Sequence, residues 1–201
     1  MNRSLLLVFL LLCACMPMPQ EQIVSHADTN WSTDLLINPF PEPNLSALLN
    51  SNFDLARDFL DLSFSLESGR ALPIFTRFEG PISVYPSGPA AESLPIDLKR
   101  LIDRLHREAD LSITFTRSKT ANITIQSVSR AQLRKTLPKT ACFVAPNISS
   151  LREFELKRNS RAASWSHQTE RRKLAIFLPS DATPQEVRDC LHEEFAQALG
   201  P

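Results

Sequence analysis

The chain has 201 residues, of which 43% are hydrophobic and 22% are charged. A chain of this length can bury one sizeable core, so we expect one main domain. Lys+Arg and Asp+Glu each total 22, so no overall field draws the protein to nucleic acid or to an anionic surface, and nucleic acid is not an expected partner. Short charged clusters such as residues 170–173 are expected to form a solvated face.

The N-terminus predicts export. Arg3 precedes an apolar run over residues 5–12, which is typical of a secretory signal and too short to span a membrane. The run ends in Leu-Cys-Ala-Cys, which resembles a bacterial lipobox with Cys15 as the lipidated residue. Residues 1–15 are therefore expected to be a lipoprotein signal peptide and lipobox; a simple cleavable signal is the alternative.

Met16, in place of an Asp, resembles the outer-membrane sorting default. We therefore expect an outer membrane lipoprotein that faces the periplasm of the bacterial cell envelope, with the lipid bilayer as one partner and an envelope protein as a second. Residues 16–50 carry several prolines and no sustained period, which is typical of a flexible tether. The globular domain is then expected over residues 51–201.

Two cysteines remain after processing, Cys142 and Cys190. In an oxidising compartment they are expected to form a disulfide. The alternative is that each is a separate small hydrophobic residue in the core.

The elements of the domain follow from hydrophobic periodicity. A helix is expected after a cap at Asn52, although residues from Leu60 onward also alternate as in a strand. Gly80 and Pro81 interrupt a strand pattern that ends in a turn at residues 86–88. The clearest amphipathic helix covers residues 95–111, with Ile96 and His106 placed on its apolar face.

Further strands are expected at residues 111–117, 121–129, 141–146 and 172–179, with a short helix at 130–137. The first two of these strands look like neighbours joined by a turn. The pattern favours an α+β fold, in which helices cover one face of a mixed or mostly antiparallel sheet.

A last helix ends the sequence. Thr183 is the expected N-cap, Pro184 the first helical residue, and Glu186 completes a capping box. Gly200 is the expected stop. A carboxylate, Glu194, falls within the apolar stripe of this helix, which is formed by Val187, Cys190, Leu191, Phe195 and Ala198. A buried carboxylate has to be hydrogen-bonded, paired, raised in pKa or placed in a cleft.

The same helix resembles the zinc-binding helix of zincins, His-Glu-x-x-His, in which two histidines four residues apart hold zinc and the Glu is the general base. A register that starts at His192 puts Ala196 in the second ligand place. A start one residue later puts Glu193 and Gln197 in the ligand places and Glu194 in the place of the base. His192 is then turned away from the site.

Oxygen ligands favour Ca²⁺ or Mg²⁺ over Zn²⁺ and bind weakly in such a small set. We therefore expect no cofactor, with a divalent metal at Glu193 and Gln197 as the weaker hypothesis, and no catalytic zinc. The alternative is that Glu193 and Gln197 form a solvent-facing pair while Glu194 bonds to a local backbone group or arginine.

Four segments, LESGRALPIFTRFEGPISV, ANITIQSV, ACFVAPN and RDCLHEEFAQALGP, occur in order. Together they resemble the proteobacterial domain-of-unknown-function family 2927, whose members are described as putative lipoproteins. The resemblance covers residues 53–201 and implies an envelope location, but no activity. The pattern of the last helix adds the expectation of a degenerate zincin-like half-domain. Family members run on past this helix, whereas the chain stops at Pro201, which raises the question of truncation at the C-terminus.

Two functions remain open. The first is a lipid-anchored protein that acts by binding or scaffolding, with a zincin-like helix that has lost its ligands. The second is a metal-assisted hydrolase, acting on peptide or cell-wall bonds, in which Glu194 activates water. The first is the expected one, so the protein is not expected to be an enzyme.

Overall fold

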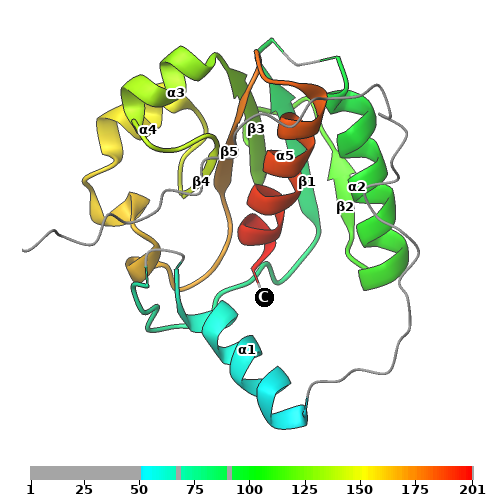
Figure 1. The fold of residues 1–201 in the computed structure, drawn as a ribbon, viewed down its shortest axis with the longest axis vertical. Coiled ribbons are helices and arrows are strands. Elements are labelled where there is room, and N and C mark those ends of the chain that lie inside the picture. Colours follow the sequence, from blue (N-terminus) through cyan, green and yellow to red (C-terminus); the bar gives the residue numbers. More distant parts are fainter. Residues whose placement is uncertain (1–50, 67–68, 90–91, 201) are drawn as a thin grey trace, which may run out of the picture. The chain divides into compact units, whose positions relative to one another are not determined.

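The computed structural model describes residues 51–66, 69–89 and 92–200 (Figure 1). The predicted signal peptide, the lipidation site Cys15 and the tether over residues 16–50 lie outside the described residues. Residues 48–201 form one compact unit. No described helix has the length and apolar character needed to cross a membrane.

A five-stranded sheet forms the centre of this unit, in the order β2-β1-β3-β5-β4. Its strands are β1 (Ile82–Ser87), β2 (Ile113–Phe115), β3 (Ile123–Val128), β4 (Phe143–Pro146) and β5 (Leu174–Pro179). Three neighbouring pairs are parallel, and only β4 runs antiparallel, against β5. The α+β prediction is confirmed. The sequence left open whether the sheet is mixed or mostly antiparallel, and the structure shows a mixed sheet.

The expected pairing of the strands around residues 113 and 123 is wrong. β1 lies between them and pairs with both, Val84 opposite Phe115 on one side and opposite Ile123 on the other. The physical reason is the helix α2 (Leu94–Ala109), which carries the chain back over the sheet so that β2 lies parallel to β1. The turn after β2 then has to lead past β1.

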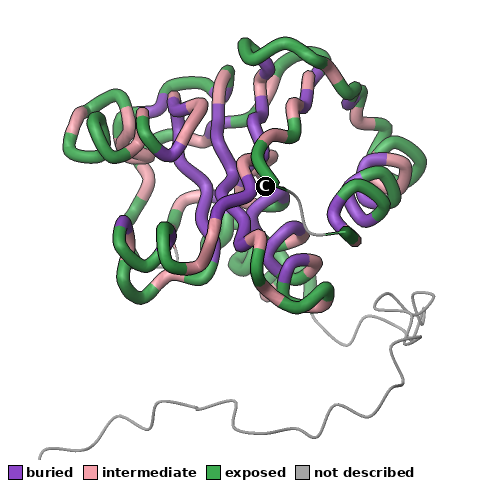
Figure 2. Tube along the Cα trace, turned by 90° about the horizontal axis from the view of Figure 1, so that it is seen from above, coloured by how far each residue is buried: buried purple, intermediate pink, exposed green. Residues whose placement is uncertain are grey.

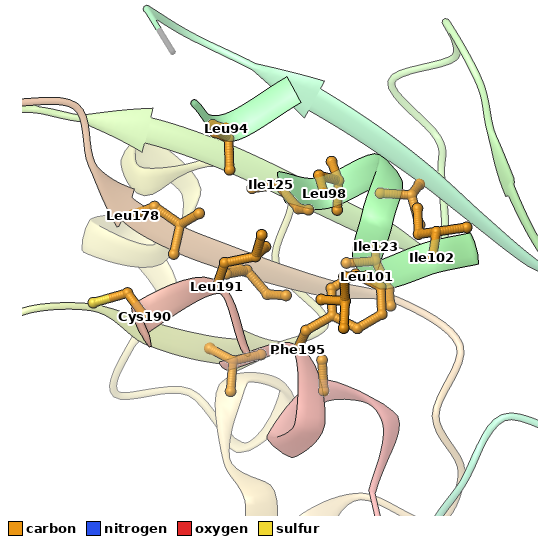
Figure 3. Packing of buried hydrophobic residues seen from close by; sticks show 14 of the residues in the cluster. Leu94, Leu98, Leu101, Ile102, Ile123, Ile125, Leu178, Cys190, Leu191 and Phe195 are labelled. Atoms are coloured by element: carbon orange, nitrogen blue, oxygen red, sulfur yellow. The ribbon is translucent and has the colours of Figure 1, made fainter. Parts of the chain in front are cut away.

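Helices cover both faces of the sheet rather than the one face that was expected. Alternate residues of β5 show this: Leu174, Ile176 and Leu178 pack in one cluster with α2 and α5 (Pro184–Leu199), as Figure 3 shows for Leu178, Leu191 and Phe195. The intervening Ala175 and Phe177 pack in a second cluster with α3 (Arg130–Thr136) and α4 (Leu151–Lys157). In Figure 2 the buried part of the chain accordingly runs through the middle of the domain.

Several boundaries differ from the sequence prediction. The first helix, α1 (Asn52–Phe64), is capped by Ser51, whose side chain accepts a hydrogen bond from the Asp54 amide. On α2, Ile96 and His106 are exposed, and the buried apolar residues are Leu94, Leu98, Leu101 and Ile102. The helix α4 and two short 3-10 turns, η1 (Arg161–Ala163) and η2 (Trp165–His167), were not predicted.

Candidate functional site

The site is built on α5, and its start is fixed as the sequence predicted. The hydroxyl of Thr183 accepts from the Glu186 amide at 3.3 Å, and Glu186 Oε2 accepts from the Thr183 amide at 2.9 Å. The hydrogen bonds that Glu186 Oε2 accepts from the amide and the hydroxyl of Thr183, with help from the nearby Arg130, lower the pKa of Glu186. Gly200 is the C-cap, with φ at 89°. Because both ends are fixed, the orientation of every side chain on α5 is set.

Glu194 is buried, as its place in the apolar stripe predicted, and only 4% of it is exposed. Glu193 is exposed and Gln197 is half-buried. A carboxylate oxygen of each glutamate lies within 4.8 Å of the other and of the sulfur of Cys142. The structure therefore brings Glu193 and Glu194 together at the side of α5 that faces β4.

The sulfur beside these carboxylates is not a thiolate. Cys142 and Cys190 form a disulfide with Cα atoms 5.9 Å apart, as the sequence predicted. A disulfide sulfur cannot act as the anionic ligand that zinc requires. Within the described residues, this is the one place where three His, Cys, Asp or Glu side chains come together. The donor set that remains is two carboxylates, which does not fit a catalytic zinc ion.

His192 lies on the side of α5 that faces α2. Burial lowers its pKa, the charge of Arg104 lowers it further, and Asp97 acts in the opposite direction. The histidine is half-buried. It is thus turned toward the neighbouring helix rather than toward Glu193 and Glu194.

A buried ion pair joins these two helices. Arg188 Nε lies 3.4 Å from Asp97 Oδ1, and Asp97 is only 5% exposed. The second oxygen, Asp97 Oδ2, is buried and accepts no hydrogen bond from the described residues. The pair fixes how α5 lies against α2. It could not be predicted from the sequence, because Asp97 lies in the first turn of a helix, where acidic residues are common.

The C-terminal end of α5 is held by Arg171, a residue that the sequence prediction placed on a solvated face. That prediction is wrong, because Arg171 is buried. Its Nε donates to the Thr76 carbonyl at 2.9 Å, and its Nη1 donates to the carbonyls of Gln197 and Ala198. Its guanidinium lies 5.0 Å from the ring centre of Trp165.

Burial lowers the pKa of Arg171 to about 10. The side chain therefore stays charged at neutral pH, and its positive charge lies at the end of a helix where the dipole is negative. No described carboxylate pairs with Arg171. The carbonyl oxygens of α5 and of Thr76 thus replace the water that this guanidinium loses.

A hollow of about 310 Å³ lies beside the disulfide, between α3 and α5. Its lining includes the apolar residues Leu133 and Pro179 and both cysteines. Charged residues also line it: Arg130 and Arg134 from α3, and Glu186, Asp189 and Glu193 from α5. Arg130 Nη2 and Glu186 Oε2 pair across it at 2.5 Å. Glu193 therefore belongs both to the lining of the hollow and to the pair of carboxylates that it forms with Glu194.

Comparison with known proteins identifies a family but no activity. The sequence profile of the family described as "Protein of unknown function (DUF2927)" matches residues 52–201. No curated protein and no solved structure matches the chain.

Proposed function

Because this chain belongs to the DUF2927 family, whose description assigns no activity, we propose a function from the residues of its own site. The protein is a lipid-anchored protein of the bacterial envelope that acts by binding rather than by catalysis. Cys15 is the anchor, and the domain over residues 51–201 faces the periplasm. The ligand that the domain binds is a segment of another envelope protein.

The disulfide between Cys142 and Cys190 is the observation that supports a function without catalysis. The sulfur nearest to the carboxylates of Glu193 and Glu194 is engaged in this bond. A zincin-like helix needs nitrogen or thiolate ligands to bind zinc tightly, and two carboxylates with Gln197 supply only oxygen. The helix then keeps the shape of a metalloprotease helix without its metal.

The hollow between α3 and α5 is the place that suits a protein segment. The apolar residues of its lining favour a buried side chain. The arginines of α3 and the acids of α5 can form hydrogen bonds with the carbonyl and amide of a peptide group, or with side chains of either charge. Arg134 is available for this role, since it forms no ion pair with another described residue.

Photo-crosslinking in intact cells tests this proposal. Ala141 and Ala131 are both exposed alanines, but only Ala141 lines the hollow. A photoreactive amino acid at position 141 is expected to form one discrete product with an envelope protein, whereas the same group at position 131 forms none. Equal labelling at both positions, or none at position 141, contradicts the binding site.

A second candidate is a hydrolase in which Glu194 is the general base. The burial of Glu194 favours it, because a carboxylate shielded from bulk water in the place of the zincin base can accept a proton from a bound water molecule. The substitution Glu194→Gln keeps the size of the side chain and removes the base. If the protein hydrolyses peptide or cell-wall bonds and this variant does not, the enzyme is the correct proposal.

A further inference from the structure

We propose that α1 is a membrane-docking helix, which lies with its apolar side in the lipid–water interface of the bilayer that carries the anchor. This inference rests on the proposed lipid anchor at Cys15. It adds a second contact with lipid, made by the folded domain itself.

The first observation is the exposure of α1. Every described residue of the helix is at least partly exposed except Ser63. Phe53 is 74% exposed and Leu62 is 75% exposed. The large hydrophobic residues that are exposed on and near α1 are Phe53, Leu55, Phe59, Leu60, Leu62 and Ile74. Outside this group, the exposed large hydrophobic residues of the described chain are Ile96, Phe115 and Leu156.

The arrangement of these residues around the helix is amphipathic. At 100° per residue, Phe53 and Leu60 fall on one flank and Leu55 and Leu62 on the other. Phe59 and the buried Ser63 lie between the two flanks. This apolar arc is wide, and it is typical of a helix that lies in an interface plane.

The remaining arc is polar and mainly acidic. It carries Asp54, Asp58 and Asp61, and Arg57 forms ion pairs with the first two of these. The stripe therefore has a formal charge of −2, from three carboxylates and one guanidinium. An acidic stripe remains in water and is repelled by anionic lipid, so the apolar contact and the anchor have to provide the binding.

The helix is joined to the domain at its C-terminal end. Phe59 and Phe64 lie 6.3 and 6.2 Å from Phe75, measured between ring centres. The Leu72 amide also donates to the Phe64 carbonyl at 2.7 Å. In Figure 1 the helix projects from the body of the domain, on the side away from α3 and α4. At this end the middle of the arc, with Phe59 and the buried Ser63, thus packs against the domain. The exposed Phe53, Leu55 and Leu62 can enter a surface without any change in the core.

The chain that precedes α1 brings it to the bilayer. The tether covers residues 16–50, which is 35 residues, and ends immediately before the cap residue Ser51. A chain of 35 residues spans at most about 120 Å, even when it is fully extended. A lipid at Cys15 therefore holds α1 at a high local concentration near the surface, and a weak contact becomes effective.

A second copy of the chain is a poorer partner for this helix. Thirteen residues form a helix about 20 Å long and about 10 Å wide. Such a contact covers a few hundred Å², whereas a stable protein–protein interface buries about 800 Å² on each partner. Contact with a bilayer does not need so large a buried area, since the lipid anchor already holds the protein at the membrane.

The test uses the exported, lipidated protein in phosphatidylcholine vesicles. A polarity-sensitive fluorophore is attached to Leu62→Cys on α1 or, as a matched control, to Leu156→Cys on α4, which is 79% exposed. Both positions are on helix surfaces, so neither substitution disturbs the core. The native disulfide is buried and is left intact by labelling without reductant.

On vesicles, the emission of the label at position 62 is expected to shift to shorter wavelength, and that at position 156 is expected to stay as in water. Replacing Phe53 and Leu55 by Ser leaves the contact of Phe59 with Phe75 in place and abolishes the shift. Anionic phosphatidylglycerol at low salt reduces the shift. Equal emission at positions 62 and 156 overturns the docking. A shift at position 62 without vesicles also overturns it, because the helix is then covered by protein.

The mass of the N-terminal peptide, measured by mass spectrometry, distinguishes a failure of the docking from a failure of the proposed lipid anchor. Acyl chains on Cys15 together with no shift at position 62 leave the anchor in place and reject the docking. An N-terminal peptide without acyl chains rejects the lipid anchor, and the docking that rests on it is rejected with it.

Discussion

Cys142, which immediately precedes β4, and Cys190, in the second turn of α5, are bonded across 48 residues of chain with their Cα atoms 5.9 Å apart. The bond fastens α5 to the antiparallel edge of the sheet, four residues before Glu194. It therefore sets where the two carboxylates lie, and it also occupies the sulfur that a metal would need.

Loss of this bond is expected to reduce stability substantially. The chain-entropy model gives about 4 kcal/mol for a loop of 48 residues. The double variant Cys142→Ser/Cys190→Ser should lower the free energy of unfolding in urea by about this amount. Reduced wild-type protein is the control and should unfold at the same urea concentration as the double variant. A midpoint that reductant leaves unchanged contradicts the structural role of the bond.

The ion pair between Asp97 on α2 and Arg188 on α5 predicts how the removal of one charge or of both changes stability. In Arg188→Met the carboxylate of Asp97 stays buried without its partner, which should destabilise the protein by about 3 kcal/mol. The double variant Asp97→Leu/Arg188→Met removes both charges and should recover most of this loss. Thermal or urea unfolding of the three proteins measures the difference. If the double variant is as unstable as Arg188→Met, the cost does not come from an uncompensated carboxylate.

Neighbouring arginines provide a matched comparison for the end of α5. Arg171→Met removes the hydrogen bonds to Thr76, Gln197 and Ala198 and should cost about 2 to 4 kcal/mol. Arg172 is paired with Glu170 in an exposed position, so Arg172→Met should cost less than about 0.5 kcal/mol. Equal losses in the two variants would show that Arg171 does not hold the helix end.

The pKa of His192 predicts a loss of stability in mild acid. Because burial and Arg104 lower this pKa in the folded protein, protonation favours the unfolded chain. The stability associated with neutral His192 is complete above the unfolded pKa of about 6.5 and is lost as the pH falls toward the lowered folded value. In His192→Gln this part of the acid slope should disappear from urea unfolding measured against pH.

The wild-type protein, measured beside His192→Gln under the same conditions, is the control for that experiment. The lowered pKa values of Glu153 and Glu186 act at more acidic pH, where stability is lost as each carboxylate is protonated. If the slope around pH 6 persists in His192→Gln, another group causes it.

How far the sequence could predict this structure depends on how local each signal is. The limits of α5 were predicted because Thr183, Pro184 and Glu186 act within one turn. Strand order was not, because the place of β1 between β2 and β3 depends on the path of α2. The burial of Arg171 was missed for the same reason, since its partners lie 26 to 95 residues away in the chain.

In the candidate site, too, the features set by local sequence were predicted and those set by contacts between distant segments were not. The burial of Glu194 and its position in the apolar stripe followed from helical periodicity, and the cysteine pair followed from the expected compartment. The closeness of Cys142 to both carboxylates did not, because it depends on β4 lying at the edge of the sheet beside α5. The hollow also depends on this arrangement, since α3 and α5 each supply part of its lining.

Metal analysis of the folded protein is the sharpest test of whether α5 lacks a catalytic metal. The protein is exposed to an excess of Zn²⁺, freed of loosely bound ions and analysed for metal beside the variant Glu193→Gln. We expect the same background metal in both proteins, because the disulfide leaves only oxygen donors at this site. One zinc ion per chain that is lost in Glu193→Gln, together with hydrolysis that is lost in Glu194→Gln, would contradict it.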